Sequence, residues 1–205
     1  MKLYYSPGAG ALASHITIRE LNLDVDLVRV DVQTHKTESG DDYYKINPKG
    51  YVPFLTTDLD TNLSEGAAIL QYLADQDREG KMIPREGSPE RYQAQEWLTF
   101  VGTEPQRILG SFFIEGHLTD AGLEFAKAKL HQRLAIMDDR LADNEYLMGA
   151  DYTIADAYAF TILNWIPAFK LDIDISKYKN LDPYLDKIRR REAVQTAMKE
   201  EGLLQ

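Results

Sequence analysis

Hydrophobic and polar positions follow a strand spacing and a helix spacing in turn near the start of the chain. Residues 2–6 predict a short strand, and apolar positions four apart predict a helix over residues 11–21. Residues 28–33 alternate between valine and a charged or polar residue, which is the period of a strand with one buried face. The chain therefore opens with a strand, a helix and a second strand.

Two more strands and a helix are expected after a polar stretch that reaches Gly50. Residues 53–57 and 61–63 predict a hairpin closed by Asp58-Leu59-Asp60. Ser64 is expected to cap the helix that follows. The order of elements is βαβ, a variable stretch, then ββα.

No strand pattern recurs in the second half of the chain. Residues 80–87 are rich in glycine, proline and charged residues, which is typical of an exposed connection. Helices with apolar stripes follow, and Thr153 with Asp156 forms a variant capping box before a helix that is apolar nearly all round. We predict an α/β domain over residues 1–79, a linker over 80–87 and an all-helical domain over residues 88–205.

Composition narrows the classes of function. The formal net charge is -10 and the isoelectric point is near 4.9, which disfavours nucleic acids and anionic membrane surfaces as partners. No apolar run approaches the ~20 residues of a membrane span, and no signal-peptide stretch is evident, so we expect no membrane association and a cytoplasmic location.

The chain has no cysteine, so any thiol chemistry must use the thiol of a ligand. Disulfides, thiolate metal sites and cysteine nucleophiles are excluded. His117 and His131 have no partner at metal-ligand spacing, and we predict no metal.

The first candidate motif is Gly50-Tyr51-Val52-Pro53, a loop that enters a strand with proline at its first position. A cis bond before Pro53 would leave the backbone N–H and C=O of Val52 facing outward, free to pair with an extended peptide. An ordinary proline at a strand edge is an equal interpretation of this motif alone.

The second motif is the strand end and helix start at residues 63–69. Free N–H groups at a helix start attract a carboxylate, and Glu65 beside them can bind an ammonium, so the pair suits an α-amino acid head group. Simple helix capping by Ser64 and Glu65 is the favoured interpretation of the motif in isolation.

The third motif is the small-residue loop at residues 6–11, between the first strand and the first helix. Its glycines allow another group to approach the backbone, and amides at a helix start stabilise a thiolate, although a plain tight turn fits equally well. The order of the three motifs places all of them at one edge of the βαβ-ββα unit.

The stretches "KLYYSPGAGALASHI", "DDYYKINPKGYVPFL" and "SEGAAILQYLAD" resemble the amino-terminal domain of bacterial beta-class glutathione transferases. "TIADAYAFTIL" resembles the buried capping-box helix of that superfamily. The resemblance implies a thioredoxin-like domain followed by an all-helical domain, glutathione as cosubstrate, a homodimer and a role in detoxification.

The resemblance also assigns residues to the ligand. It implies that Val52 pairs with the cysteine of glutathione, that Pro53 is cis, and that Glu65 with Gly66 holds the γ-glutamyl group. The family's basic residue near the glycine carboxylate corresponds to His35, with Lys36 as its substitute. The implied glutathione-binding set is Ala9, Gly10, His35, Lys36, Gly50, Tyr51, Val52, Pro53, Glu65 and Gly66.

Two residues depart from the family pattern. The characteristic cysteine corresponds to Gly10, and the usual histidine of the second domain corresponds to Gln106. The remaining catalytic candidates are the hydroxyls of Tyr5, Ser6 and Ser14 and the amides of Gly10 and Ala11. The residues expected to line an apolar cleft for the second substrate are Gln106, Phe112, Phe113 and Trp165.

The expected function is attack of the glutathione thiolate on an electrophile. The alternative is a non-catalytic glutathione-binding or carrier protein, which Gly10 and Gln106 suggest. Conjugation, peroxidase, isomerase and dehalogenase activities are not separated by the sequence. His15 matches a histidine of the family, and we expect a structural role for it.

Overall fold

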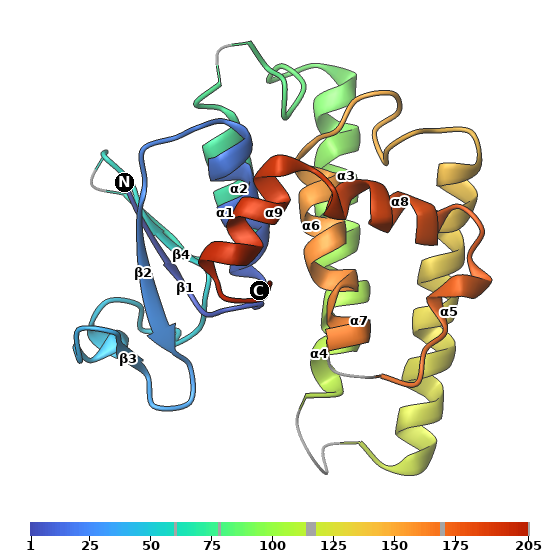
Figure 1. The fold of residues 1–205 in the computed structure, drawn as a ribbon, viewed down its shortest axis with the longest axis horizontal. Coiled ribbons are helices and arrows are strands. Elements are labelled where there is room, and N and C mark those ends of the chain that lie inside the picture. Colours follow the sequence, from blue (N-terminus) through green and yellow to red (C-terminus); the bar gives the residue numbers. More distant parts are fainter. Residues whose placement is uncertain (60, 78, 114–117, 169–170, 205) are drawn as a thin grey trace. The chain divides into compact units, whose positions relative to one another are not determined.

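The computed structural model describes the chain in five stretches, residues 1–59, 61–77, 79–113, 118–168 and 171–204. The chain divides into two compact units (Figure 1). One unit comprises Met1–Ile83 and Arg191–Gln205, and the other comprises Pro84–Arg190. The end of the chain thus packs with the first unit, whereas the sequence analysis had grouped it with the helical domain.

The first unit contains a five-stranded mixed sheet with the order β3-β2-β1-β4-β5. Its strands are β1 (Lys2–Tyr5), β2 (Asp26–Asp31), β3 (Lys36–Thr37), β4 (Phe54–Thr56) and β5 (Asn62–Leu63). β1 runs parallel to β2 and antiparallel to β4. This arrangement confirms the predicted thioredoxin-like class, and β3 falls in the stretch that the sequence left without an element.

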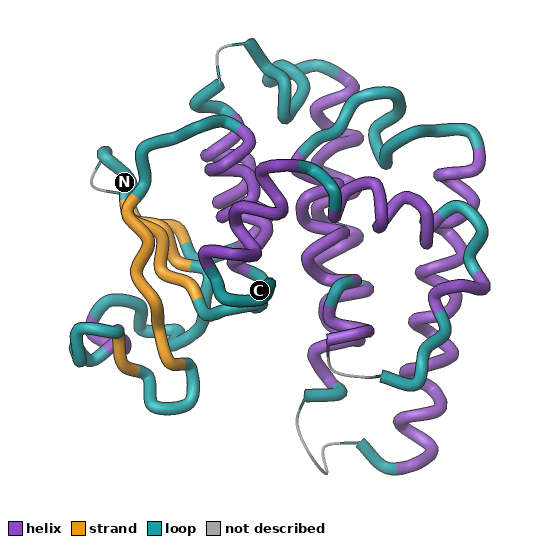
Figure 2. The backbone as a smooth tube through the Cα atoms, viewed as in Figure 1, coloured by secondary structure: helices purple, strands orange, loops and turns teal. Residues whose placement is uncertain are grey.

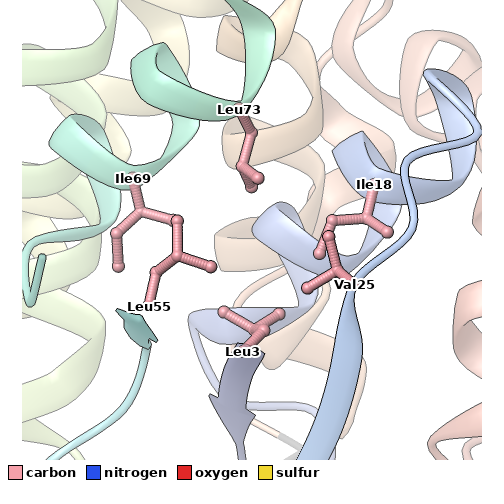
Figure 3. Close-up of a cluster of buried hydrophobic side chains, with 6 residues drawn as sticks. All are labelled: Leu3, Ile18, Val25, Leu55, Ile69 and Leu73. Carbon is pink, nitrogen blue, oxygen red and sulfur yellow. The ribbon is translucent and has the colours of Figure 1, made fainter. Parts of the chain in front are cut away.

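Two helices cover one face of this sheet. α1 (Ala11–Glu20) and α2 (Gly66–Ala74) meet the strands in a buried cluster made of Leu3, Ile18, Val25, Leu55, Ile69 and Leu73 (Figure 3). α9 (Glu192–Glu200) packs against α1. Since strand side chains alternate, Tyr4 points to the opposite face and joins Val30, Tyr43 and Phe54 there.

The hairpin of β4 and β5 forms as predicted, with Leu55 opposite Leu63. Its predicted turn includes Asp60, which lies outside the described residues. β2 ends at Asp31, one residue before Val32, whose side chain is exposed. The predicted strand was therefore slightly too long at this end.

The second unit consists of helices joined by loops (Figure 2). The helices are α3 (Pro89–Thr103), α4 (Pro105–Ser111), α5 (Asp120–Ala142), α6 (Ile154–Leu163), α7 (Trp165–Ala168) and α8 (Leu181–Arg189), with a 3-10 turn η2 (Ile175–Lys177). α3 and α4 are separated at Glu104 because Pro105 lacks the N–H that a continuous helix needs. None of the described helices is long and apolar enough to cross a membrane.

The predicted capping box begins α6. The carboxylate of Asp156 is fully buried and accepts hydrogen bonds from the Thr153 N–H (2.8 Å), the Leu147 N–H (2.9 Å) and the Tyr184 hydroxyl (2.8 Å). Burial raises the pKa of Asp156 despite these donors. One side chain therefore joins the start of α6, the preceding loop and α8.

Replacing Asp156 with alanine is expected to lower the free energy of unfolding by about 3 kcal/mol or more, because several buried donors lose their acceptor at ~1–3 kcal/mol each. Urea unfolding followed by circular dichroism measures this loss. Asp151→Asn, at an exposed position of the same loop, is the matched control and should change the unfolding free energy by less than about 0.5 kcal/mol. Similar unfolding midpoints for Asp156→Ala and the control would contradict the assignment.

Candidate functional site

The loop between β1 and α1 presents free backbone amides. The loop closes on itself through hydrogen bonds from the Ala9 N–H to the Ser6 carbonyl and from the Leu12 N–H to the Ala9 carbonyl, both 3.0 Å. The N–H groups of Gly10 and Ala11 have no acceptor among the described residues. α1 therefore begins with two amides that can donate to an anion.

The end of the chain holds this loop in place. The Gly8 N–H donates to Oε2 of Glu201 at 2.8 Å, and a methyl carbon of Leu203 lies 3.4 Å from where a Cβ of Gly8 would be. Gly8 has a φ of +71°, which favours glycine, so the loop combines a required backbone shape with a contact 193 residues away. Glu201 and Leu203 could not be predicted from the sequence, because such a distant contact has no local pattern.

His15 lies between two carboxylates. Its side chain is fully buried; Nδ1 is 3.0 Å from Oε1 of Glu201, and Nε2 is 2.7 Å from Oε2 of Glu200. Arg19 also donates to Oε2 of Glu200 at 2.7 Å. Burial acts to raise the pKa of Glu200, but the hydrogen bonds from Arg19 and His15 outweigh it, and the net pKa is lowered. These contacts agree with the expected structural role of His15.

Tyr5 ends β1 close to this group, with its ring 6.0 Å from the ring of His15. Burial, followed by the negative charges of Glu201 and Glu38, raises the pKa of the Tyr5 hydroxyl. The hydroxyl therefore keeps its proton at neutral pH and can act as a donor. It makes no hydrogen bond to any described residue.

Ser14, another of the hydroxyl candidates, is fully buried in α1. Its Oγ has no hydrogen-bond partner in the described part of the chain. Burial separates this hydroxyl from solvent, whereas that of Tyr5 is only partly buried. Of Tyr5 and Ser14, Tyr5 is the more accessible donor.

His35 and Tyr44 form a second small cluster. The His35 backbone is left-handed, with a φ of +52°, and its ring lies 4.3 Å from that of Tyr44. Nδ1 is 3.1 Å from the Gly50 carbonyl and Nε2 is 3.1 Å from the Tyr44 hydroxyl. Because a carbonyl only accepts, Nδ1 carries the proton, so both ring nitrogens are engaged inside the protein.

The loop that leads into β4 is held by two hydrogen bonds to the backbone carbonyl of Tyr51. The Tyr51 carbonyl accepts hydrogen bonds from the Asn47 amide (2.7 Å) and from the Tyr43 hydroxyl (3.0 Å). Burial raises the pKa of Tyr43 to about 12, so this hydroxyl stays a donor. The Val52-Pro53 bond is cis, as expected, and the backbone N–H and C=O of Val52 bond to none of the described residues.

The start of α2 has no side-chain cap. Glu65 occupies the cap position in an extended conformation, and its side chain makes no cap hydrogen bond. The prediction that Ser64 caps this helix is therefore wrong: the helix begins one residue later than a Ser64 cap requires. The Glu65 carbonyl accepts hydrogen bonds from the N–H groups of Ala68 and Ile69. The N–H groups of Gly66 and Ala67 precede this first turn of hydrogen bonds and have no acceptor among the described residues.

The Glu65 carboxylate turns instead toward the loop before β4. Its Oε1 accepts hydrogen bonds from Nζ of Lys49 at 2.6 Å and from the Tyr51 hydroxyl at 3.0 Å. These hydrogen bonds, the one from Lys49 first, lower the pKa of Glu65. The order of the motifs predicted that Tyr51 and Glu65 lie at one edge of the domain. Lys49 was not predicted, because a lysine in a loop is usually an ordinary solvent-exposed cation.

The four residues predicted to line a cleft all lie in the second unit. Phe113 and Trp165 make an edge-to-face ring contact at 5.1 Å. Gln106 accepts a hydrogen bond from the Tyr158 hydroxyl through Oε1, and Phe112 directly follows α4 as its C-terminal cap. Of this set, Phe113 and Trp165 are brought together by a direct contact between their rings.

The described residues contain no group of three histidine, cysteine or carboxylate side chains arranged to hold a metal ion. Nδ1 of His131 is 2.6 Å from the Tyr178 hydroxyl. His117 lies outside the described residues.

Comparison with known proteins defines the family. The profile "Glutathione S-transferase, N-terminal domain" matches residues 1–75, and "Glutathione S-transferase, C-terminal domain" matches residues 112–192. Glutathione S-transferase GstA of Escherichia coli O157:H7 is 39% identical, over 99% of this chain and 100% of its own. The chain belongs to the glutathione S-transferase family.

Solved structures place it near the bacterial beta class. The beta-class enzyme of Sphingomonas chungbukensis superimposes with a TM-score of 0.93 at 41% identity, over 100% of both chains. A sphingomonad glutathione S-transferase complexed with glutathione gives a TM-score of 0.93 at 39% identity, again over 100% of both chains. The resemblance stated from the sequence motifs is thereby confirmed.

Glu201→Gln is expected to lower the free energy of unfolding by about 3 kcal/mol, because a buried partner of His15 and of the Gly8 amide loses its charge. Glu200→Gln is the matched control. Glu200 is 38% exposed and also binds Arg19, so the loss in unfolding free energy is expected to be about 1 kcal/mol or less. Urea unfolding at pH 7 measures both values, and equal losses would refute the assignment of Glu201.

The pH dependence of the Glu200 contribution has a defined sign. Its folded pKa lies below the ordinary 4.5, so the contribution is complete above pH 4.5 and is lost as the pH falls through the lowered folded value. The difference in unfolding free energy between wild type and Glu200→Gln should therefore shrink as the pH falls below 4.5.

Proposed function

We propose that this protein is a glutathione transferase that binds reduced glutathione across the edge formed by the β1–α1 loop, the loop before β4 and the start of α2. The observation that carries the proposal is the unpaired backbone of Val52 beside the uncapped start of α2. An extended peptide with an α-amino acid head group satisfies both features at once. Glutathione is such a peptide.

The γ-glutamyl group is assigned to the start of α2. The free N–H groups of Gly66 and Ala67 suit its α-carboxylate, and the Glu65 carboxylate suits its α-ammonium. The cysteine of glutathione then pairs with the backbone of Val52, next to cis Pro53.

The glycine carboxylate is assigned to Lys36 rather than to His35. Both ring nitrogens of His35 are engaged, by Gly50 and Tyr44, whereas the exposed ammonium of Lys36 pairs with no described carboxylate. A cation without a partner gains more from an incoming carboxylate than a ring that must first break its own hydrogen bonds. Ala9 and Gly10 complete the proposed binding loop.

The thiol is assigned to the amides of Gly10 and Ala11 and to the Tyr5 hydroxyl. A model thiol has a pKa of about 8.5, and lowering it by ~2 units needs about 2.7 kcal/mol of preferential thiolate stabilisation. A charge-assisted hydrogen bond from a hydroxyl supplies ~1.5–3 kcal/mol of this, and the amides of α1 supply the rest. The thiol proton is released to solvent. In a conjugation the sulfur lone pair then forms the new bond to the electrophilic carbon, while a leaving group departs from that carbon with its bonding electron pair or the electron pair of a π bond at that carbon moves to the neighbouring atom, which takes up a proton from solvent.

The electrophile is assigned to the apolar residues Phe112, Phe113 and Trp165, together with Gln106. By analogy with its family, the protein acts as a homodimer in the cytoplasm, and its role is detoxification. Whether the reaction is conjugation, peroxide reduction, isomerisation or dehalogenation depends on the electrophile presented to the bound thiolate.

A glutathione carrier without chemistry is the second candidate, and one observation favours it: Gly10 and Gln106 provide neither the thiol nor the imidazole of the family pattern. This alternative predicts an unshifted thiol in the bound ligand. It also predicts that Gly10→Cys introduces thiol chemistry that the wild type lacks.

The bound glutathione thiol is expected to titrate with a pKa of about 6.5, ~2 units below its ordinary value. Tyr5→Phe should raise that pKa by about 1 unit or more, since a donor of ~1.5–3 kcal/mol is lost. Thiolate absorbance in the ultraviolet measures both, and the protein adds no thiolate signal because it has no cysteine. S-Methylglutathione gives the blank for tyrosine absorbance. An unshifted bound thiol would favour the carrier, and no binding would reject both functions.

Lys36→Gln is expected to raise the dissociation constant of glutathione about fivefold, which corresponds to ~1 kcal/mol for an exposed ion pair. His35→Gln, which removes the engaged ring, should weaken binding by a smaller factor. Isothermal titration at low and at high salt measures both variants, and the effect of Lys36 should shrink with salt. A larger loss in His35→Gln than in Lys36→Gln would reverse the assignment.

A further inference from the structure

The Glu65 carboxylate is already bound to a cation within the protein. Nζ of Lys49 lies 2.6 Å from Oε1, and the hydroxyl of Tyr51 lies 3.0 Å from the same oxygen. Lys49 also lies over the ring of Tyr51, with Nζ 5.8 Å from its centroid. The other oxygen, Oε2, has no partner among the described residues.

An ammonium on this carboxylate has the same chemistry as the α-ammonium that the proposed function assigns to Glu65. The two cations bind one carboxylate, and they carry the same charge at close range. Two unit charges about 4 Å apart repel by roughly 1 kcal/mol in water, which is about a fivefold change in a dissociation constant. Lys49 therefore opposes the ligand's ammonium whether it leaves Oε1 or stays there.

We propose that Lys49 is an internal competitor for the α-ammonium of the glutamyl group, and that it sets how strongly the site distinguishes ligands with this ammonium from ligands without it. This inference rests on the proposed function of Glu65. Lys49 is thus a specificity-determining residue: it lowers the gain that the ammonium brings, and it binds the charge of Glu65 when no ligand is present.

Tyr51 makes this exchange possible. Its hydroxyl is a neutral donor on the same oxygen, so it holds the carboxylate in place without repelling a second cation. When Lys49 leaves Oε1, that oxygen keeps one hydrogen bond. Both Lys49 (48% exposed) and Glu65 (63% exposed) reach solvent, so the lysine can move away without leaving a buried charge behind.

The test compares two ligands that differ only in the α-amino group: glutathione and glutaryl-cysteinyl-glycine, which keeps the carboxylate and lacks the amine. Selectivity is the ratio of their dissociation constants, measured by isothermal titration on the full chain. Lys49→Met is expected to raise the selectivity for glutathione about fivefold over wild type. Lys45→Met is the matched control, since Lys45 is exposed and contacts no carboxylate among the described residues, and it should leave the ratio unchanged.

An unchanged or lower ratio in Lys49→Met would overturn the proposal, because the lysine would then be neutral toward the ligand's ammonium or assist it. If wild type and Lys49→Met both fail to bind glutathione, the proposed function fails, and the competitor proposal fails with it. Binding by Lys49→Met alone would support the competition. A measurement without ligand tests the contact of Lys49 with Glu65 separately from the proposed glutathione binding. In a carbon-detected NMR titration, the Glu65 pKa should rise in Lys49→Met and not in Lys45→Met.

Discussion

The buried carboxylate of Glu201 is the contact on which the arrangement of the first unit depends. It joins three parts of the chain that are distant in sequence: the β1–α1 loop through the Gly8 amide, α1 through His15, and the end of the chain that carries Glu201 itself. A buried charge is costly unless donors surround it, and each of its two oxygens has one. The position of the free amides at the start of α1 therefore follows from a residue near the end of the sequence. This is also why the end of the chain packs with the first unit.

Glu65, in the same unit, has the opposite environment. Glu201 is closed off from solvent, with each oxygen bound to a partner within the fold, whereas Glu65 is exposed and has one oxygen with no partner in the described chain. A closed carboxylate stabilises a structure, and an open one is available to a ligand. In the proposed site, glutamate therefore serves for support at Glu201 and for recognition at Glu65, with burial and the number of donors deciding which role it takes. Because the chain has a formal net charge of -10, the protein as a whole does not attract an anionic peptide. The proposed site therefore relies on local groups, which are two helix starts and the ammonium of Lys36.

Local patterns predicted most elements of the first unit and the helical class of the second, because strand and helix periods and the capping box of α6 depend on neighbouring residues. They also predicted which segments meet at the proposed site, since loops at one edge of a βαβ-ββα unit converge by topology. They did not predict Glu201, Leu203 or Lys49, whose contacts link segments with no shared pattern. Ser64 was misassigned for a related reason: a serine before a helix looks like a cap, and only the backbone conformation of Glu65 moves the cap position by one residue. The engagement of His35 by Tyr44 and Gly50 was equally invisible, because it depends on a left-handed backbone at His35.

The proposed site has no cysteine, and Gln106 stands where the family pattern has a histidine, so the proposed stabilisation of a thiolate is assigned to groups that carry no formal charge of their own. Backbone amides do not titrate, and burial raises the pKa of the Tyr5 hydroxyl above its ordinary value, so the set of donors keeps its protons from acid to mildly alkaline pH. The protonation state of the ligand's thiol, rather than that of a protein nucleophile, then governs the pH response of the proposed reaction. The raised pKa has a second consequence: a tyrosine that holds its proton tightly donates a weaker hydrogen bond than one with a lowered pKa. A substantial part of the proposed stabilisation is therefore assigned to the free amides of Gly10 and Ala11. The buried contact between Gly8 and Glu201 holds the loop that carries these amides, so it also bears on the proposed thiol chemistry.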